Sequence, residues 1–177
     1  MNKSKIAGIA FNVPDNIITN NDLEKMMDTT DEWIQTRSGI KERRWVKPGV
    51  ANSDLALPAC EEAIQNAGIN ADDIDAIIVG TVTSDFNFPG MAPIIQQKLG
   101  ISAHVPAYDI SAACSAFIYL LEIGDQYIKS GKYKNILLIG SDIMSTIIER
   151  TPEGRATGVL FGDGSGAVVL QPSNDDS

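Results

Sequence analysis

The chain has 177 residues, 44% of them hydrophobic, and a formal net charge of −9 at pH 7. This length and composition predict one domain with a hydrophobic core. The acidic balance argues against nucleic acid as the main partner, and no run approaches the roughly 20 apolar residues that a membrane span requires. The first residues lack the layout of a signal peptide, so we expect a cytoplasmic protein with no membrane partner.

The first hundred residues predict strands alternating with helices. Thr30 is a candidate helix cap because its hydroxyl can accept from a first-turn N–H, and Gly39 is a candidate helix stop. We predict a strand over 5–13, a short helix capped by Asn20 or Asn21 and running to Met27, a helix over 31–37, an exposed strand over 41–46, a helix from Asn52 or Ser53 to Ala67, a buried strand over 75–83, an exposed loop over 84–90 and a helix over 92–99.

The same alternation continues to the end of the chain. The glycine run 162–166 lacks the lysine of a phosphate-binding loop and opens no helix, so we interpret it as a tight turn. The whole pattern indicates an α/β fold with a mostly parallel central sheet and helices on both faces. The elements predicted here are a strand over 105–110, a helix from about Cys114 to 130, a buried strand over 135–141, a polar loop over 145–157, two short strands over 158–161 and 167–170 that form an antiparallel edge, and a polar tail over 172–177.

Cys60, Cys114 and the single histidine, His104, are the candidates for thiol or imidazole chemistry. Two cysteines give neither a disulfide framework nor metal-ligand spacing, so we predict no metal site. Cys60 falls within the apolar pattern of a helix and is interpreted as core. His104 lies in a predicted loop, where an isolated histidine is more often a surface residue than a catalyst.

Cys114 follows a predicted strand and stands where a helix begins. Unpaired N–H groups and the positive end of the helix dipole favour the thiolate there, and the thiolate is the nucleophilic form. The neighbours Ala112 and Ala113 are small and leave room for a substrate. Local physics leaves two interpretations open, a nucleophile and a buried structural cysteine.

Several segments, each weak alone, together resemble the N-terminal half of β-ketoacyl-acyl-carrier-protein synthase III, a condensing enzyme with the thiolase fold. They span most of the chain in the family's order. The resemblance implies a thiolase-like domain over 1–171, a polar tail over 172–177 and an absent C-terminal thiolase half. The segments are Asp22-Leu23-Glu24-Lys25-Met26, Asp31-Glu32-Trp33-Ile34 with Arg37, Gly39 and Ile40, Ala112-Ala113-Cys114, Asp125-Gln126-Tyr127-Ile128-Lys129-Ser130-Gly131 and Phe161-Gly162-Asp163-Gly164-Ser165-Gly166.

The resemblance implies that Cys114 takes an acyl group from acyl-CoA as a thioester. Malonyl-acyl-carrier protein then decarboxylates, and its carbanion attacks that thioester. The backbone N–H of Cys114 is a candidate oxyanion donor. The implied function is an acyltransferase that initiates fatty-acid synthesis, with acyl-CoA and acyl carrier protein as partners. Coenzyme A enters as a thioester substrate, and no permanently bound cofactor is expected.

Four further residues match functional positions of the family. Trp33 and Arg155 match the tryptophan and arginine placed around the coenzyme's adenine, and both side chains stack well on a purine. Arg37 matches a second arginine of that site, suited to phosphate. Phe88 matches a position that reaches across a dimer interface into the partner's acyl pocket. Without the resemblance, base rates favour core packing for Trp33, a solvated face for the arginines and a loop anchor for Phe88.

Two departures from the family pattern bear on function. The family's catalytic histidine and asparagine lie in a second half that these 177 residues do not include, and His104 does not match that histidine. Ala116 stands where related sequences commonly have glycine, which leaves the size of the acyl pocket open. In the family, the helix after Cys114 is sandwiched between two halves. Here that helix is apolar over much of its circumference, so we expect a homo-oligomer or a complex with a separate C-terminal half.

Three functions are compared on this basis. The leading prediction is a synthase III type acyltransferase, or its nucleophile-bearing half. The alternative is a binding or interaction module that keeps the half-fold but turns nothing over, because the histidine and asparagine are missing. Another thiolase-fold activity, such as hydroxymethylglutaryl-CoA synthase, is disfavoured by the 31–40 segment with Trp33 and Arg37.

Overall fold

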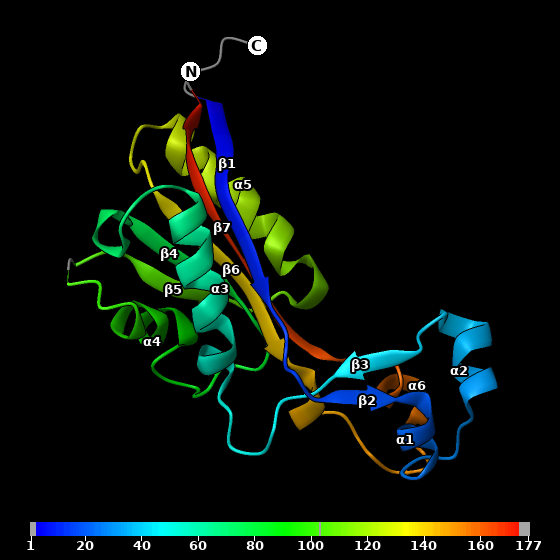
Figure 1. Cartoon of the computed structure of the whole chain (residues 1–177). Helices are drawn as coiled ribbons and strands as arrows, with labels where there is room; N and C mark the ends of the chain where they lie inside the picture. The colour runs from blue at the N-terminus through cyan, green and yellow to red at the C-terminus, as the bar shows by residue number, and fades with distance from the viewer. Residues whose placement is uncertain (1–2, 103, 174–177) are drawn as a thin grey trace. The chain divides into compact units, whose positions relative to one another are not determined.

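The computed structural model describes residues 3–102 and 104–173. These residues form two compact units, whose elements are labelled in Figure 1. The larger one, here called the sheet unit, contains residues 3–12, 51–142 and 165–173. The other, here called the small unit, contains residues 13–50 and 143–164. Each unit is therefore assembled from segments that are far apart in the sequence.

The sheet unit is built on a five-stranded sheet in the order β1-β7-β6-β4-β5. β4 pairs in parallel with both β5 and β6, whereas β1 pairs antiparallel with β7. The predicted mostly parallel central sheet is confirmed, with β1 as an antiparallel strand at one edge. The strands are β1 (Lys3–Asn12), β4 (Ala76–Gly80), β5 (Ala107–Ile110), β6 (Ile136–Ile143) and β7 (Asp163–Ser173).

Helices cover both faces of this sheet, as predicted (Figure 1). α3 (Asn52–Asn66) and α4 (Met91–Lys98) lie on one face, and α5 (Ala116–Lys129) lies on the other. Because side chains alternate along a strand, Ile77 packs towards α3 and α4 while Ile78 packs towards α5. Burying one such isoleucine contributes roughly 1.5–3 kcal/mol.

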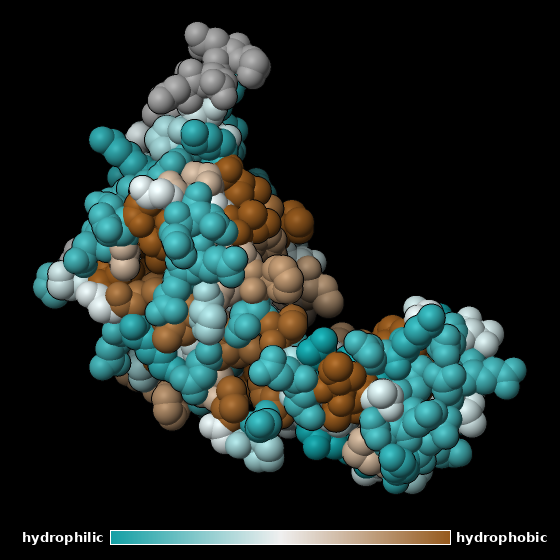
Figure 2. Space-filling view, viewed as in Figure 1, coloured by the Kyte–Doolittle hydropathy of each residue, from teal (hydrophilic) through white to brown (hydrophobic). Residues whose placement is uncertain are grey.

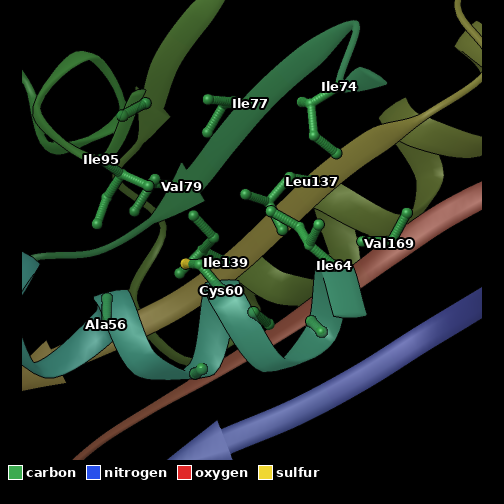
Figure 3. Close-up of a cluster of buried hydrophobic side chains, with 14 of the residues drawn as sticks. Ala56, Cys60, Ile64, Ile74, Ile77, Val79, Ile95, Leu137, Ile139 and Val169 are labelled. Carbon is green, nitrogen blue, oxygen red and sulfur yellow. The ribbon is translucent and has the colours of Figure 1, made fainter. Parts of the chain in front are cut away.

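Cys60 belongs to the core between α3 and the sheet. Figure 3 shows its sulfur close to Ile139 and on the same face of α3 as Ala56 and Ile64. The side chain is 0% exposed. Burial, with a smaller contribution from the Glu61 carboxylate, raises the pKa of the Cys60 thiol to about 12. The interpretation of Cys60 as a packing residue is therefore confirmed.

The small unit combines an antiparallel pair, β2 (Ile17–Thr19) and β3 (Glu42–Arg44), with short helices. These are α1 (Asn20–Glu24), α2 (Asp31–Ser38) and α6 (Arg155–Gly158). α2 is bounded as predicted, since the Thr30 hydroxyl accepts from the Trp33 N–H and Gly39 adopts φ 74°. A compact core holds the unit together: Leu23, Met27, Ile34, Trp45 and Val159.

Two helix starts differ from their predictions. Thr19, rather than Asn20 or Asn21, caps α1, because the Thr19 hydroxyl and the Asp22 carboxylate form a reciprocal capping box. α1 also ends at Glu24 rather than Met27. Residue 51 is the N-cap of α3, and the Asn52 side chain is buried instead of capping the helix.

The predicted strands also need correction. The strand over 41–46 is shorter and not exposed throughout, because Arg43 is buried. Residues 158–161 form no strand, because helix α6 continues into a turn that its own backbone hydrogen bonds close. The glycine run therefore opens β7 and makes no hairpin turn. β7 pairs with β1 through Ser173, so the predicted tail does not begin at Pro172; residues 174–177 lie outside the described part.

Candidate active site

Cys114 lies beyond the carboxyl end of β5, at the edge where the parallel strands of the sheet unit finish. It sits in the 3-10 turn Ala113–Ser115, directly before α5 begins at Ala116. Open α/β sheets bind ligands at this edge. Cys114 is exposed, so the local alternative of a buried structural cysteine does not hold for this chain.

The backbone immediately before Cys114 is strained. Ala113 adopts φ 46°, in the left-handed region. Only a few per cent of non-glycine residues do so, at a cost of roughly 1–3 kcal/mol, and such strain gathers at functional sites. The sequence carried no sign of this strain, because the residue with positive φ is alanine rather than glycine.

A glycine in the sheet accommodates the Ala116 methyl group. Ala116 is buried, and a Cβ added to Gly80 would lie 2.8 Å from the Ala116 Cβ. Phe117 lies over Gly140 in the same way, at 3.3 Å from a Cβ added there. The start of α5 therefore approaches the sheet closely because β4 ends in a glycine and β6 has another within it. The methyl group that distinguishes Ala116 from glycine packs against β4 inside the sheet unit.

A buried polar network, which was not predicted, occupies the same edge of the sheet. The Asn52 amide donates to the Thr81 hydroxyl at 3.2 Å and to the Ser141 carbonyl at 3.0 Å, and it accepts from the Ser141 hydroxyl at 2.5 Å. Asp142 accepts from the hydroxyls of Thr81 at 2.9 Å and Thr83 at 2.8 Å. The network satisfies polar groups where β4 and β6 end, and so supports the edge on which Cys114 stands.

Phe88 lies in the loop between β4 and α4, and its side chain is 90% exposed. Asp109 holds the end of that loop, because its carboxylate accepts the N–H groups of Met91 at 2.5 Å and Ala92 at 2.8 Å. These are the first two residues of α4, where a carboxylate is favourable. The loop is thus anchored beside the strand that leads to Cys114, while Phe88 faces solvent. Its role across a dimer interface stays a prediction.

Trp33, Arg37 and Arg155 come together in the small unit. The Arg37 guanidinium carbon is 4.3 Å from the centroid of the Trp33 ring, and that of Arg155 is 5.0 Å from it. Trp33 and Arg37 are four residues apart on α2 and so share a helix face. Arg155 arrives from α6, far along the chain. Both distances fall within the range of cation–π contacts, so the three residues predicted for the coenzyme form one cluster.

Trp33 also packs against the core of the small unit, so part of its indole serves packing. Arg155 is held from its other side by Asp28. Its Nη1 donates to the Asp28 carbonyl oxygen at 2.8 Å and lies 3.6 Å from the carboxylate. This ion pair is largely open to water, where such pairs contribute little. The arginine is therefore positioned but not locked.

A second arginine–tryptophan contact was missed. The Arg150 guanidinium carbon lies 4.6 Å from the Trp45 ring centroid, and its Nη2 donates to the Ser145 carbonyl at 2.6 Å. Trp45 is buried, and its indole N–H donates to the Phe161 carbonyl at 3.3 Å. No spacing in the sequence links these residues, which hold the 143–164 segment to Trp45, the residue after β3.

His104 is exposed and precedes β5, whereas Cys114 follows that strand, so the two lie at opposite ends of it. Across residues 3–102 and 104–173, no group of three or more histidine, cysteine or acidic side chains could hold a metal ion. In the same residues, no helix is long and apolar enough to cross a membrane.

Comparison with known proteins supports the resemblance seen in the motifs. A family model described as 3-oxoacyl-[acyl-carrier-protein] synthase III matches residues 108–177. β-Ketoacyl-[acyl-carrier-protein] synthase III of Koribacter versatilis is 47% identical over 98% of this chain and 51% of its own length. A Vibrio parahaemolyticus synthase III is 50% identical over 97% and 54%. The crystal structure of 3-oxoacyl-[acyl-carrier-protein] synthase III from Aquifex aeolicus has a TM-score of 0.93 and 47% identity, covering 98% of this chain and 55% of that one.

This chain corresponds to the N-terminal half of β-ketoacyl-acyl-carrier-protein synthase III. The chain spans about half the length of the synthase III relatives that it matches. The priming β-ketosynthase of a polyketide pathway has the same fold, with a TM-score of 0.92 at 31% identity. The α/β fold is thus that of the thiolase-like synthase III enzymes.

Proposed function

We propose that this chain is the nucleophile-bearing half of a synthase III acyltransferase and that Cys114 accepts an acyl group from acyl-CoA. The observation that carries this is the exposed Cys114 on a strained turn, ahead of a helix and at the carboxyl edge of the sheet. Acyl carrier protein is the partner we propose for the second step. A cytoplasmic location remains a prediction from the sequence.

The acyl transfer follows from the chemistry of a thiolate. The Cys114 sulfur attacks the thioester carbonyl carbon, and the carbonyl oxygen becomes an oxyanion that the backbone N–H of Cys114 would stabilise. The carbon–sulfur bond to coenzyme A then breaks, and the coenzyme leaves as a thiolate that takes up a proton. The acyl group remains on Cys114 as a thioester. In the complete reaction, the carbanion from decarboxylated malonyl-acyl-carrier protein attacks that thioester and releases the cysteine.

Trp33, Arg37 and Arg155 are the residues we propose for the adenine end of coenzyme A. A purine inserted between the indole and the Arg155 guanidinium needs about 7 Å, two contact distances of roughly 3.5 Å each. Arg155 now lies 5.0 Å from the ring centroid, so it must retreat by about 2 Å on the same reckoning. Its solvent-exposed ion pair with Asp28 makes that movement inexpensive. Arg37 remains in place to meet phosphate.

An apolar groove on the α5 side of the sheet unit supports a partner. The groove has a volume of about 420 Å³ and is lined by side chains such as Ile6, Ile9, Phe11 and Phe117. Phe11 is 73% exposed and Ile118, on α5, is 62% exposed. Figure 2 shows hydrophobic residues gathered over β1 and α5. An apolar surface of this kind usually has a partner, and we propose a separate C-terminal synthase half or a second copy of the chain.

Under this proposal, the complete condensation reaction requires residues that this chain does not contain. The family's histidine and asparagine would come with the C-terminal half, and without them decarboxylation loses its main electrostatic support. Light scattering at micromolar concentration tests the partner: a monodisperse monomer would count against self-association. Adding a C-terminal half in trans then distinguishes a split enzyme from a binding module. Rescued condensation supports the split enzyme, and no rescue supports the binding module.

Intact-protein mass spectrometry after incubation with acetyl-CoA tests the proposed function. An acetyl adduct on the wild-type chain and on Cys60→Ala, but not on Cys114→Ala, is the expected result. Cys60 is a matched control because it is fully buried and its pKa is raised to about 12. An adduct that persists in Cys114→Ala, or a folded wild-type chain that forms none, would contradict the proposal that this half acylates Cys114.

A further inference from the structure

Two buried polar side chains of the small unit, Asn20 and Arg43, lie between the helices that carry the Trp33 cluster. Asn20 is the first residue of α1 and is 1% exposed, and Arg43 lies in β3 and is 6% exposed. Their side-chain hydrogen bonds go to residues other than Trp33, Arg37 and Arg155. Burial of such groups is costly unless their hydrogen bonds are satisfied, so the position of those bonds is informative.

Asn20 ties both ends of α2, the helix that carries Trp33 and Arg37. Its amide nitrogen donates to the Asp31 carboxylate at 2.8 Å, at the start of α2, and to the Ile40 carbonyl at 2.8 Å, just beyond its end. Asp31 also accepts from Gln35 at 2.7 Å. The hydrogen bonds from Asn20 and Gln35 lower the pKa of Asp31, so its carboxylate is charged at neutral pH.

Arg43 carries the connection from Asn20 to α6. Its Nη1 donates to the Asn20 side-chain oxygen at 2.8 Å, and its Nη2 donates to the Val159 carbonyl at 2.9 Å. Val159 is the C-cap of α6, the helix that begins with Arg155. A further bond from Nη1 reaches the Ile18 carbonyl at 3.3 Å. The two side chains thus form a continuous buried relay from α2 to α6.

Burying this relay is energetically unfavourable compared with burying apolar side chains. The oxygens that accept from Arg43 are all neutral, and its Nε is buried with no hydrogen-bond partner in the described part of the chain. Burial lowers the pKa of the Arg43 guanidinium, which shows that the surroundings disfavour its charge. Apolar residues of similar volume often replace buried charges without loss of stability. The geometry of the hydrogen bonds, rather than stability, is therefore what the relay provides.

We infer that Asn20 and Arg43 are positioning residues that fix α2 relative to α6, and so set the spacing of Trp33 and Arg155 for a purine. The inference rests on the proposed function, because it takes that cluster to be the adenine site of coenzyme A. With both helices fixed at their backbones, the opening of about 2 Å that a purine needs comes from the exposed Arg155 side chain. Less conformational entropy is then lost on binding, because the site is already ordered before the ligand arrives.

The test compares two acyl donors on the full chain, acetyl-CoA and acetyl-pantetheine. The second has the same thioester and lacks the adenine nucleotide. For Asn20→Ala and Arg43→Met we expect the rate of Cys114 acylation by acetyl-CoA to fall about tenfold or more, while the rate with acetyl-pantetheine is unchanged. Arg43→Lys should lose less than Arg43→Met, because the lysine ammonium can still donate to one acceptor, although it cannot bridge both as the guanidinium does. A general loss of structure would lower both rates together.

Asn16→Ala is the matched control, because Asn16 is in the same unit and, among the described residues, its side chain donates only to the Trp45 carbonyl, at 3.3 Å. It should leave both rates unchanged. Folded Asn20→Ala and Arg43→Met variants with the wild-type ratio of the two rates would overturn the inference. If Asn20→Ala fails to fold, Arg43→Lys and Arg43→Met decide the question.

A ligand-free measurement separates this inference from the proposed function. If the wild-type chain reacts with neither donor, the proposed function fails, and the relay is judged by NMR on the Arg155 side-chain protons. Protons over an indole are shifted upfield by its ring current. Loss of that shift in Asn20→Ala and Arg43→Met, but not in Asn16→Ala, supports the relay. An unchanged shift in the folded variants refutes it.

Discussion

The two units hold their functional residues by different physical means. In the sheet unit, a buried polar network supports the strand ends, but the helix that follows Cys114 is set by apolar packing, with Ala116 of α5 pressed against Gly80 of β4. In the small unit, Trp33 and Arg155 are arranged by buried polar side chains, among them Arg43 and Asn20. Apolar packing is non-directional and tolerates exchange of similar shapes, whereas a buried polar group depends on particular partners. We call the buried polar side chains of the small unit the polar framework and the packed apolar contacts of the sheet unit the apolar framework. Substitutions should therefore destabilise the protein more in the polar framework than in the apolar one.

Asp163→Ala in the small unit should have the largest effect of these predictions. The Asp163 side chain is 4% exposed and accepts from the Ser145 N–H at 2.7 Å, the Ser145 hydroxyl at 2.6 Å and the Val46 N–H at 2.7 Å. Removing it leaves three donors unpaired, of which the two from Ser145 are buried, so we expect a loss of about 3 kcal/mol or more. Chemical denaturation with CD detection measures the loss.

Asp163→Asn is the control for that change, because it keeps the shape and one side-chain acceptor. It should fall between the wild type and Asp163→Ala. An Asp163→Ala loss below about 1 kcal/mol, the net value of an ordinary hydrogen bond, would show that the polar framework is not the more demanding of the two.

Gly80→Ala tests the apolar framework and should cost less. The added Cβ would lie 2.8 Å from the Ala116 Cβ, closer than side-chain carbons normally approach. Overpacking of this kind costs about 1–3 kcal/mol. Ala116→Gly in the same chain should recover most of the loss, since the two methyl groups compete for one space. Denaturation of the two single variants and the double variant gives the coupling energy, and additive losses would show that the two positions do not share that space.

This contrast also explains what could be predicted from the sequence. The packing of Ile77 and Ile78 on opposite faces of the sheet follows from the period of a strand, and Thr30 and Gly39 mark the ends of α2 by their own local chemistry. The predicted exposure of the strand over 41–46 was wrong at Arg43, because the burial of this side chain depends on acceptors such as Val159, far along the chain. Local sequence contains no information about such a partner.

In the candidate site, too, contacts between residues close in sequence could be predicted, and contacts that depend on long-range packing could not. Trp33 and Arg37 are one helical turn apart, so their contact follows from the sequence alone. All three residues entered the candidate site through the family resemblance, and the contact of Arg155 could not be predicted from spacing, because α6 is brought to α2 by long-range packing. The positive φ of Ala113 could not be foreseen either, since alanine has no intrinsic preference for that conformation.

The smallest expected effect concerns the exposed cap of α1. Hydrogen bonds from the Thr19 hydroxyl and backbone N–H, with help from Lys25, lower the pKa of Asp22 from 3.8 to about 2. Because the folded-state pKa is depressed, the cap stabilises the protein fully above about pH 4 and loses this contribution as the pH falls towards 2. Asp22→Asn should therefore melt below the wild type at pH 5, and the difference should shrink at pH 2.

Thermal unfolding of both proteins between pH 5 and pH 2 measures that difference, with Asp15→Asn as the control for an acid-to-amide change elsewhere in the same unit. The gap between wild type and Asp22→Asn should narrow through this window, while the Asp15→Asn gap should not follow it. Parallel curves for wild type and Asp22→Asn would mean that the Asp22 charge contributes nothing to the cap. The polar framework of the small unit would then depend on its buried members alone, such as Asp163 and Arg43.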